Sequence, residues 1–270
     1  MNGSGFRIGS SFGRVGQLVR SESLRLISEI DCRYSQRAPV GARALECSVC
    51  GYTGRFATAW ALTGKRPHAH CPRCRAAERH RLQSLVLDRL AESFDFSKLS
   101  MLHVAPESVF AQRFSQSFGQ YVTTDIERQD VDLQLDLTSL DLPDNSFDVV
   151  YASHVLEHIR DDKLALAEVA RVLRPGGIAV LPVPIACLAT VEYPEAVASE
   201  AWHVRAPGPD YFDRYREWFR VEVFASGDFD AKHQLYVHED RTRFPNQFAP
   251  YRTPSPGPLH IDLVPVCYVR

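Results

Sequence analysis

The stretch from Phe147 to Val180 constrains the fold of this chain more than any other. Its first residues, Phe147 to Tyr151, have the apolar density of a strand that is buried on both faces of a sheet. Apolar residues then recur at helical spacing up to Leu173, and Pro175 with the two glycines after it ends the helix. Ile178 to Val183 supplies a second buried strand. The stretch therefore predicts a parallel strand pair joined by a right-handed helical crossover.

Strand and helix signals also alternate before this unit. We expect strands at Met101–Ala105, Tyr121–Thr124 and Val131–Leu135, and a helix over Ser108–Ser117. Such alternation predicts an α/β fold in which a parallel sheet carries helices on its faces.

After the unit, the pattern predicts a helix and the closing strands of the sheet. The helix is expected over Tyr211–Phe219, and the strands at Val221–Phe224 and Gln234–Val237. The tail from Phe244 is rich in proline, which excludes a helix there. We expect the tail to form an extended arm that ends in Leu263–Val269.

These signals divide the chain into four parts. Residues 1–44 form a tail and a helix, and residues 45–90 form a cysteine-bearing module with a linking helix. Residues 99–238 form the α/β domain, and residues 239–270 are a proline-rich extension. Prolines break the α/β rhythm between residues 185 and 210, so we expect an insertion there that covers the edge of the sheet.

Composition narrows the class of protein. Net charge is formally −2, so no overall field draws the chain onto nucleic acid or an anionic membrane. No apolar run approaches the roughly 20 residues that span a bilayer, and the first residues lack the apolar core of a secretory signal. We therefore expect a cytoplasmic protein without membrane contact.

Four of the seven cysteines form two C-x2-C pairs, Cys47 with Cys50 and Cys71 with Cys74. Four thiolates at this spacing match a tetrahedral structural zinc site, in which each pair supplies two ligands from a tight turn. His68 and His70 lie beside the second pair and could replace one ligand. A closed site leaves no position for a reacting water, so we assign the zinc to folding.

Basic residues cluster directly after the second pair. They could face the phosphates of a nucleic acid, or they could form a solvated helix start with ion pairs. The arginines of this cluster are Arg73, Arg75, Arg79 and Arg81.

Polar residues follow several predicted strands where the strands end. Asp125 ends the second strand, 18 positions beyond Glu107, at the distance where nucleotide-binding folds place an acidic residue on a ribose. Asp136 follows the third strand, and Ser153 and His154 follow the fourth. Because the carboxyl ends of parallel strands meet at one edge, we expect a cofactor site there.

Four segments of the chain resemble class I S-adenosylmethionine-dependent methyltransferases of the type 11-like group. The segments are HVAPE at 103–107, TTDI at 123–126, LDLTSLDLPDNSFDVVYASHVLEHI at 135–159 and EVARVLRPGGIAV at 168–180. The segment RPHAHCPRCRAAERHR at 66–81 is similar to a bacterial subgroup with a zinc-knuckle segment before this domain. The resemblance implies a Rossmann-like, mostly parallel seven-stranded sheet, preceded by a small zinc-binding module.

The same resemblance implies which residues bind S-adenosylmethionine. It implies His103, Ala105 and Glu107 near the methionine portion, Asp125 on the ribose, Asp136 and Leu137 at the adenine, and Ser153 and His154 near the sulfonium. The first loop of the family is rich in glycine, whereas the turn from Val104 to Glu107 contains none, and Pro106 removes an amide donor.

Methyl transfer needs alignment of donor and acceptor, and a base where the acceptor carries a proton. His154, His158 and His203 are the expected bases, although each could instead be a structural histidine. We expect Trp202, His203, Arg205 and Tyr211, in or just beyond the insertion, to contact the substrate.

Three functions remain open from sequence. The leading one is a methyltransferase that acts on a small molecule or secondary metabolite at oxygen or nitrogen. The second is an RNA methyltransferase in which the zinc module and its arginines hold the substrate. The third is a non-catalytic binding protein that keeps the methyltransferase fold.

Overall fold

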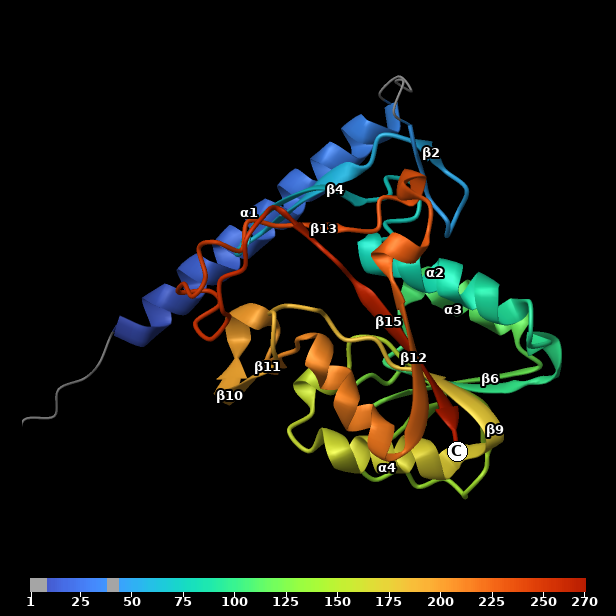
Figure 1. Cartoon of the computed structure of the whole chain (residues 1–270). Helices are drawn as coiled ribbons and strands as arrows, with labels where there is room; N and C mark the ends of the chain where they lie inside the picture. Colours follow the sequence, from blue (N-terminus) through green and yellow to red (C-terminus); the bar gives the residue numbers. More distant parts are fainter. Residues whose placement is uncertain (1–8, 38–43) are drawn as a thin grey trace, which may run out of the picture.

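The computed structural model describes residues 9–37 and 44–270. Its centre is a seven-stranded sheet (Figure 1). In spatial order the strands are β12 (Phe219–Ala225), β15 (Leu263–Val269), β9 (Leu173–Val180), β8 (Phe147–Ala152), β5 (Ser100–Val104), β6 (Gln120–Asp125) and β7 (Leu133–Gln134). Only β15 runs antiparallel to its neighbours in this sheet. The predicted α/β class and mostly parallel sheet are confirmed.

Each face of the sheet carries its own apolar core. On one face, α4 (Asp162–Val172) and the 3₁₀ helix η4 (Pro209–Glu217) pack on alternate residues of the central strands, such as Val150. On the other face, α2 (Glu78–Ala91) and α3 (Ser108–Ser117) cover the intervening residues, such as Val149. Successive residues of a strand point to opposite faces, which explains why these strands are apolar throughout.

The strand–helix–strand crossover predicted from Phe147 to Val180 is present. β8 pairs in parallel with β9, and α4 connects them. The residues Pro175 to Gly177 lie within β9 and not before it, at a register shift between Phe147 and Val149. Gly176 has a φ of +80°, which a glycine adopts without steric cost. The turn thus interrupts the strand pairing locally while the strand continues.

The last strand of the sheet differs from the sequence prediction. We expected Gln234–Val237 to close the sheet and the proline-rich tail to lie outside it. Instead β15, at the end of that tail, pairs with β9 and β12, for example Val266 with Val180. Of the predicted segment, only Val237 lies in a strand, the short β13 (Val237–His238) that pairs with β14 (Leu259–His260). Leu263–Val269 is a continuous apolar run, and Pro265 lies opposite Val223 of β12 but outside the residues that pair with β9, which are Val266 to Tyr268.

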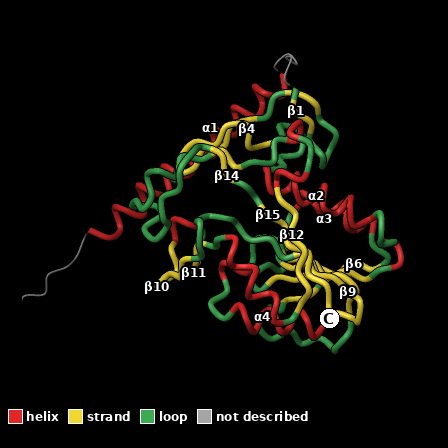
Figure 2. The backbone as a smooth tube through the Cα atoms, in the orientation of Figure 1, coloured by secondary structure: helices red, strands yellow, loops and turns green. Residues whose placement is uncertain are grey.

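A smaller module packs above the sheet (Figures 1 and 2). It contains two antiparallel pairs, β1 (Leu45–Glu46) with β2 (Thr53–Gly54) and β3 (Ala57–Ala61) with β4 (Gly64–His70). The long helix α1 (Gly9–Arg37) lies along β3, where Ser28 Oγ accepts a hydrogen bond from the amide of Trp60. The predicted N-terminal helix therefore packs on the module. Residues 1–8 and 38–43 of the predicted first part lie outside the described residues.

The predicted insertion forms a hairpin beside the sheet. β10 (Val191–Val197) pairs with β11 (His203–Ala206), and η3 (Ala198–Glu200) lies between them. The remaining short helices are η1 (Phe96–Lys98), η2 (Leu156–His158), η5 (Ser226–Asp228) and η6 (Ala231–His233). Among the described helices, none combines the length and the apolar character that crossing a membrane requires.

Candidate functional site

The carboxyl ends of β5, β6 and β8 open into a pocket of about 540 Å³, which we call the strand-end pocket. Small-molecule sites have volumes of roughly 300–1,000 Å³. The walls include five of the eight residues that the sequence predicts at the cofactor: Ala105, Asp125, Asp136, Leu137 and His154. The fold thus brings together side chains that lie up to 49 positions apart, because parallel strands end at one edge.

Other pocket residues were not predicted at the cofactor, although Trp202 was expected to contact the substrate and His158 to act as a base. Several follow a predicted residue directly in the chain, and only their position in the fold reveals that they line the pocket. Ala201 and Trp202 come from the insertion, where both adopt left-handed φ values of +55° and +66°. The wall residues for which the sequence predicted no role are Val104, Ile126, Glu127, Leu135, Val155, Ile159 and Ala201.

Asp125 and Asp136 share one geometry at the pocket. Oδ1 of Asp125 accepts hydrogen bonds from the amides of Glu127 (2.9 Å) and Arg128 (3.0 Å). Oδ1 of Asp136 accepts from the amide and the hydroxyl of Thr138, at 2.8 and 2.7 Å. The Oδ2 atoms of these two carboxylates have no hydrogen-bond partner within residues 9–37 and 44–270. Each carboxylate is therefore fixed by one oxygen and offers the other to a donor group of a ligand.

The glycine-free first turn keeps the backbone conformation of a glycine. Ala105 has a φ of +49°, and its amide donates to the carbonyl of Thr124 at 2.7 Å. A left-handed φ costs an L-residue other than glycine about 1–2 kcal/mol. Pro106 loses its amide donor, but its carbonyl accepts a hydrogen bond from Arg128 at 2.7 Å. Alanine, with the smallest side chain after glycine, leaves the turn open to the pocket.

We expect Ala105→Val to weaken binding of S-adenosylhomocysteine about tenfold or more, because a β-branched residue at this φ is a steric outlier and displaces the turn. Ala105→Gly is the matched control, and it should bind within about twofold of the wild type, since glycine adopts this φ freely. Isothermal titration calorimetry measures both. Equal binding by the valine variant would show that the turn does not contact the cofactor.

Three predicted cofactor residues face away from the pocket. His103 lies on the face that α3 covers, where its Nδ1 is 2.9 Å from the hydroxyl of Tyr121. Burial lowers the pKa of His103 to about 4, so its ring is neutral. Ser153 is buried and accepts a hydrogen bond from Nε2 of Gln83 at 3.1 Å. Strand alternation places both side chains on this face, which the sequence motif alone did not reveal.

Glu107 forms part of the contact between the module and the domain. Its Oε1 accepts hydrogen bonds from Arg79 (2.9 Å) and from Nε2 of His80 (2.8 Å). Burial opposes ionisation of Glu107, but the hydrogen bond from His80 and the charge of Arg79 outweigh it, so the pKa of this carboxyl lies below its ordinary value. Glu107 thus anchors α2 to the start of α3 and does not line the strand-end pocket.

The three predicted bases surround one buried carboxylate. Oε1 of Glu157 lies 3.4 Å from Nδ1 of His154 and 3.9 Å from Nε2 of both His158 and His203. The Glu157 side chain is 0% exposed, and among the described residues neither of its oxygens has a hydrogen-bond partner. Burial lowers the pKa of His203 to about 4, against the opposing charge of Glu157. The structure therefore brings all three predicted histidines together.

Two of the predicted substrate residues are structural. Arg205 is 1% exposed, and its guanidinium donates to the carbonyls of Leu156 and Ile159, each at 2.6 Å. Tyr211 is 0% exposed and donates to Oδ2 of Asp162 at 2.7 Å. Neither side chain lines the strand-end pocket or the second cavity described below. The expected substrate contact of Arg205 and Tyr211 is therefore corrected. Arg205 lies in β11 of the insertion and therefore links the insertion to η2 through hydrogen bonds to these carbonyls.

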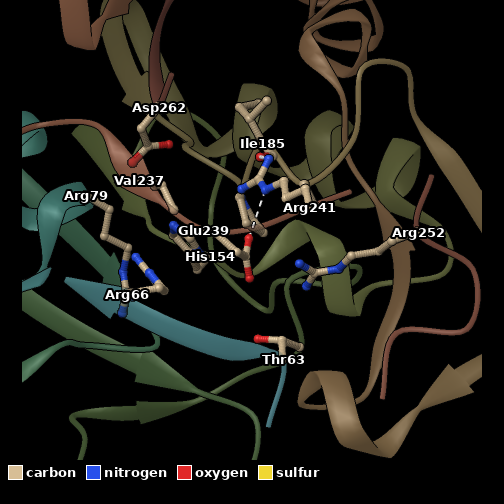
Figure 3. A pocket seen from close by; sticks show the side chains of 12 residues that line it. Thr63, Arg66, Arg79, His154, Ile185, Val237, Glu239, Arg241, Arg252 and Asp262 are labelled. Carbon is tan, nitrogen blue, oxygen red and sulfur yellow. Dashed lines mark hydrogen bonds and ion pairs between the residues drawn. The ribbon is translucent and has the colours of Figure 1, made fainter. Parts of the chain in front are cut away.

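A second, smaller cavity of about 160 Å³ lies between the module and the domain (Figure 3). We call it the inter-module cavity. β4 and α2 contribute one side of it, and the segment between β13 and β15 contributes the other. His154 lines this cavity and the strand-end pocket. The lining residues are Thr63, Arg66, Arg79, His154, Pro184, Ile185, Ala186, Val237, Glu239, Arg241, Arg252 and Asp262.

The inter-module cavity is lined by several charged side chains beside apolar ones. Arg241 donates to Glu239 at 2.8 Å, and the guanidinium of Arg252 projects towards the same space (Figure 3). Nε of Arg66 and Nε of Arg79 are buried without a hydrogen-bond partner in the part of the chain that the structure describes. Burial raises the pKa of Asp262 above its ordinary value. This cavity was not predicted from the sequence, because its walls come from separate regions of the chain.

The four predicted zinc ligands form one cluster. Their sulfur atoms all lie within 4.8 Å of one another, with 3.6 Å between Cys47 and Cys74 and between Cys50 and Cys71. Four sulfurs at a zinc–sulfur distance of about 2.3 Å in a tetrahedron are about 3.8 Å apart, so the cluster fits zinc. His68 and His70 are not members of this cluster. The two C-x2-C turns also share one backbone conformation. The residues that follow them, Gly51 and Arg75, have φ values of +68° and +66°.

Arg81 is a fully buried cation next to the cysteine cluster, so it fits neither of the two alternatives for the basic cluster, a phosphate contact or a solvated helix start. It is 0% exposed and donates to five backbone carbonyls, among them Ala76 (2.9 Å) and Gln234 (2.6 Å). Its guanidinium also lies 4.4 Å from the ring centre of Phe56. A zinc ion with four thiolates carries two negative charges, which a buried arginine offsets. Arg81 thus joins the cysteine cluster, β4 and the end of η6.

We expect Arg81→Leu to destabilise the protein by about 3 kcal/mol or more, because five carbonyls lose their donor and three of these hydrogen bonds are fully buried. Arg89→Leu is the matched control on the exposed side of the same helix, and it should stay within about 0.5 kcal/mol of the wild type. Urea unfolding measures both values. A small effect at Arg81 would show that water replaces the guanidinium.

The other arginines of the basic cluster are partly engaged by the protein. Arg79 pairs with Glu107 at 2.9 Å, and Arg73 donates to the carbonyl of Cys50 at 3.1 Å. Arg75 lines a groove against α1. The basic cluster therefore does not form one continuous surface for phosphates.

Comparison with known proteins agrees with the geometry. Residues 91–181 match the family model described as Methyltransferase domain. An O-methyltransferase from Aspergillus nomiae is 35% identical over 100 residues, which are 36% of this chain and 37% of that protein. An uncharacterised 37.1 kDa transposon protein of Streptomyces fradiae is 42% identical over 67 residues, which are 25% of this chain and 19% of that protein. The chain thus spans well under two thirds of the length of these relatives.

Among solved structures, an S-adenosylmethionine-dependent methyltransferase from Mesorhizobium loti aligns with a TM-score of 0.48 and 15% identity, over 72% of this chain and 100% of that one. The matched family segment runs from the end of α2 through β9 and contains β5, β6 and β8, whose ends form the strand-end pocket. Residues 91–181 are thus the part of the chain that is similar to methyltransferase domains.

Proposed function

We propose that this protein is an S-adenosylmethionine-dependent methyltransferase that acts on a small molecule at oxygen or nitrogen. The observation that carries the proposal is the position of His154, which lines the strand-end pocket and the inter-module cavity. A methyltransferase must bind donor and acceptor side by side and exclude water between them. Two cavities that share one wall residue meet this requirement.

The strand-end pocket is the proposed cofactor site. The free Oδ2 of Asp125 would accept hydrogen bonds from the ribose hydroxyls, and that of Asp136 from the adenine amine. Leu137 would line the adenine ring, and Trp202, 65% exposed at the insertion, would cover the pocket. Bound S-adenosylmethionine supplies a methyl group that its sulfonium has already activated.

The inter-module cavity is the proposed acceptor site. A volume of about 160 Å³ holds a small polar molecule, and a polynucleotide does not fit in it. Guanidinium groups with unused N–H donors would orient carboxylate, phosphate or hydroxyl oxygens of the acceptor. The O-methyltransferase of Aspergillus nomiae and another from Aspergillus sclerotiorum, 34% identical over 92 residues, support oxygen as the acceptor atom.

His154 is the proposed base. Its Nε2 is buried and has no hydrogen-bond partner among the described residues, while its Nδ1 faces Glu157. Its φ of +56° is strained for a histidine, which is typical of a side chain held for function. Glu157 would fix the ring and stabilise its charged form while Nε2 takes the proton that the acceptor loses.

The test is a transfer assay with methyl-labelled S-adenosylmethionine and the zinc-loaded protein. The acceptors are a panel of small phenols, carboxylic acids and amines, with total RNA alongside. The proposal predicts label in a small molecule. Label in RNA alone would favour the nucleic-acid alternative, and absence of cofactor binding by the folded protein would favour a non-catalytic binding protein.

A further inference from the structure

We propose that Glu157, His158 and His203 bind a divalent first-row transition cation at the wall of the strand-end pocket. One ligand atom of each residue lies within 4.8 Å of the other two, as in the cysteine cluster. The set combines two imidazoles with one carboxylate, a donor set typical of Mn²⁺, Fe²⁺, Co²⁺ and Zn²⁺ sites that keep open positions.

The state of Glu157 points independently to a missing cation. Its carboxylate is 0% exposed, and neither oxygen has a hydrogen-bond partner among the described residues. An ionised group buried in this way is costly unless it is paired or coordinates a metal. Arg205 does not neutralise it, because the contacts of Arg205 are to backbone carbonyls and to Glu192 and Asp162. Among the described residues, the ion-pair partners of Glu157 are His154, His158 and His203, which carry a charge only when protonated.

The distances fit coordination after a small contraction. Nε2 of His158 and Nε2 of His203 each lie 3.9 Å from Oε1 of Glu157. Ligand atoms at about 2.0–2.2 Å from a cation are about 3–3.5 Å apart, so shifts below about 1 Å complete the site. The His158 and His203 rings already meet edge to face, with centroids 4.7 Å apart. η2 fixes two of the ligands, and β11 fixes the third.

The open side of the proposed site faces the two cavities. His158 lines the strand-end pocket, and His154, 3.4 Å from Glu157, lines both cavities. A cation there would bind an acceptor oxygen and favour loss of its proton to His154. The oxygen would then take the methyl group, while the sulfur–carbon bond breaks and its electron pair stays on sulfur. This role rests on the proposed function, whereas binding of the cation does not.

Manganese(II) is the probe that separates this site from the cysteine cluster, because thiolates prefer softer ions. The full chain is loaded with zinc, cleared of weakly bound metal, and titrated with Mn²⁺ under electron paramagnetic resonance. We expect one bound Mn²⁺ per chain. Glu157→Gln and His203→Ala should each bind at least about tenfold more weakly. His238→Ala, a histidine outside the triad, should bind as the wild type does.

Either of two binding results would overturn the inference. The first is that the folded wild type binds no Mn²⁺, and the second is that Glu157→Gln binds Mn²⁺ as tightly as the wild type. Stability without Mn²⁺ gives a second readout. If Glu157 is a cation ligand, the Glu157→Gln variant without Mn²⁺ should be at least as stable as the wild type, because glutamine removes a buried charge. Marked destabilisation would instead make Glu157 a structural anchor for the histidines and contradict the inference.

Calorimetry with S-adenosylhomocysteine on the same Mn²⁺-free sample separates the two proposals. Cofactor binding without Mn²⁺ binding would leave the proposed function intact and reject the cation site. Mn²⁺ binding without cofactor binding would support the cation site and reject the proposed function.

Discussion

Cys71→Ser is expected to unfold the zinc module and to abolish methyl transfer. The apolar cluster of the module contains the buried residues Cys47, Phe56, Cys71 and Ala76, so two of its four buried members are predicted zinc ligands. So small a cluster cannot hold the fold without the metal. Structural zinc contributes about 10–16 kcal/mol of binding free energy in small modules. Loss of one ligand should therefore expose residues 45–77 to limited proteolysis.

The same variant should affect the two cavities differently. Thr63 and Arg66, in or beside β4, belong to the module and line the inter-module cavity, whereas the strand-end pocket is built on the sheet and its loops. We expect Cys71→Ser to lose methyl transfer, while its affinity for the cofactor falls by less than about tenfold. Cys32→Ser, a buried cysteine outside the cluster, is the matched control and should keep its zinc. If Cys71→Ser retained zinc and activity, the cluster would not be a structural zinc site.

Asp125→Ala is expected to weaken binding of S-adenosylmethionine by about 10- to 100-fold. Hydrogen bonds to a charged group contribute about 1.5–3 kcal/mol, and each 1.4 kcal/mol changes Kd tenfold. Asp125 also holds the turn at Glu127 and Arg128 through Oδ1, so Asp125→Asn, which keeps an oxygen acceptor, should lose less. Isothermal titration calorimetry measures the three Kd values.

Asp213→Ala is the matched control for a lost carboxylate. Asp213 is an exposed acid whose partner is Arg216, and it lies outside the strand-end pocket. Its replacement should leave Kd unchanged. Equal binding by Asp125→Ala and Asp213→Ala would remove Asp125 from the cofactor site.

Local sequence patterns predicted the parts of the fold that depend on local chemistry. The apolar density of Phe147–Tyr151 and the proline and glycines after Leu173 predicted the β8–α4–β9 unit, because buried strands and helix ends have local requirements. The cysteine cluster followed from spacing for the same reason. Long-range pairing has no local signal, so the place of Leu263–Val269 inside the sheet was not predicted.

The site could be predicted only in part. Asp125, Asp136 and His154 end neighbouring strands, so their meeting at one pocket followed from the parallel sheet. Arg205 and Arg81 are chemically suited to bind anions, but the fold buries them against backbone carbonyls. Burial of this kind is a tertiary property. Two of the arginines that do line a cavity, Arg241 and Arg252, lie in a tail whose composition resembles a loose extension.

The most direct test of the account is hydrogen–deuterium exchange mass spectrometry of the zinc-loaded protein with and without S-adenosylmethionine. A ligand in the strand-end pocket should slow exchange in the segments around 104–107, 125–128, 135–138 and 154–159, because it covers the amides at the strand ends. The account predicts protection in these four segments together. Unchanged exchange at all four, in protein that is folded and saturated with the ligand, would contradict a cofactor site at this edge of the sheet.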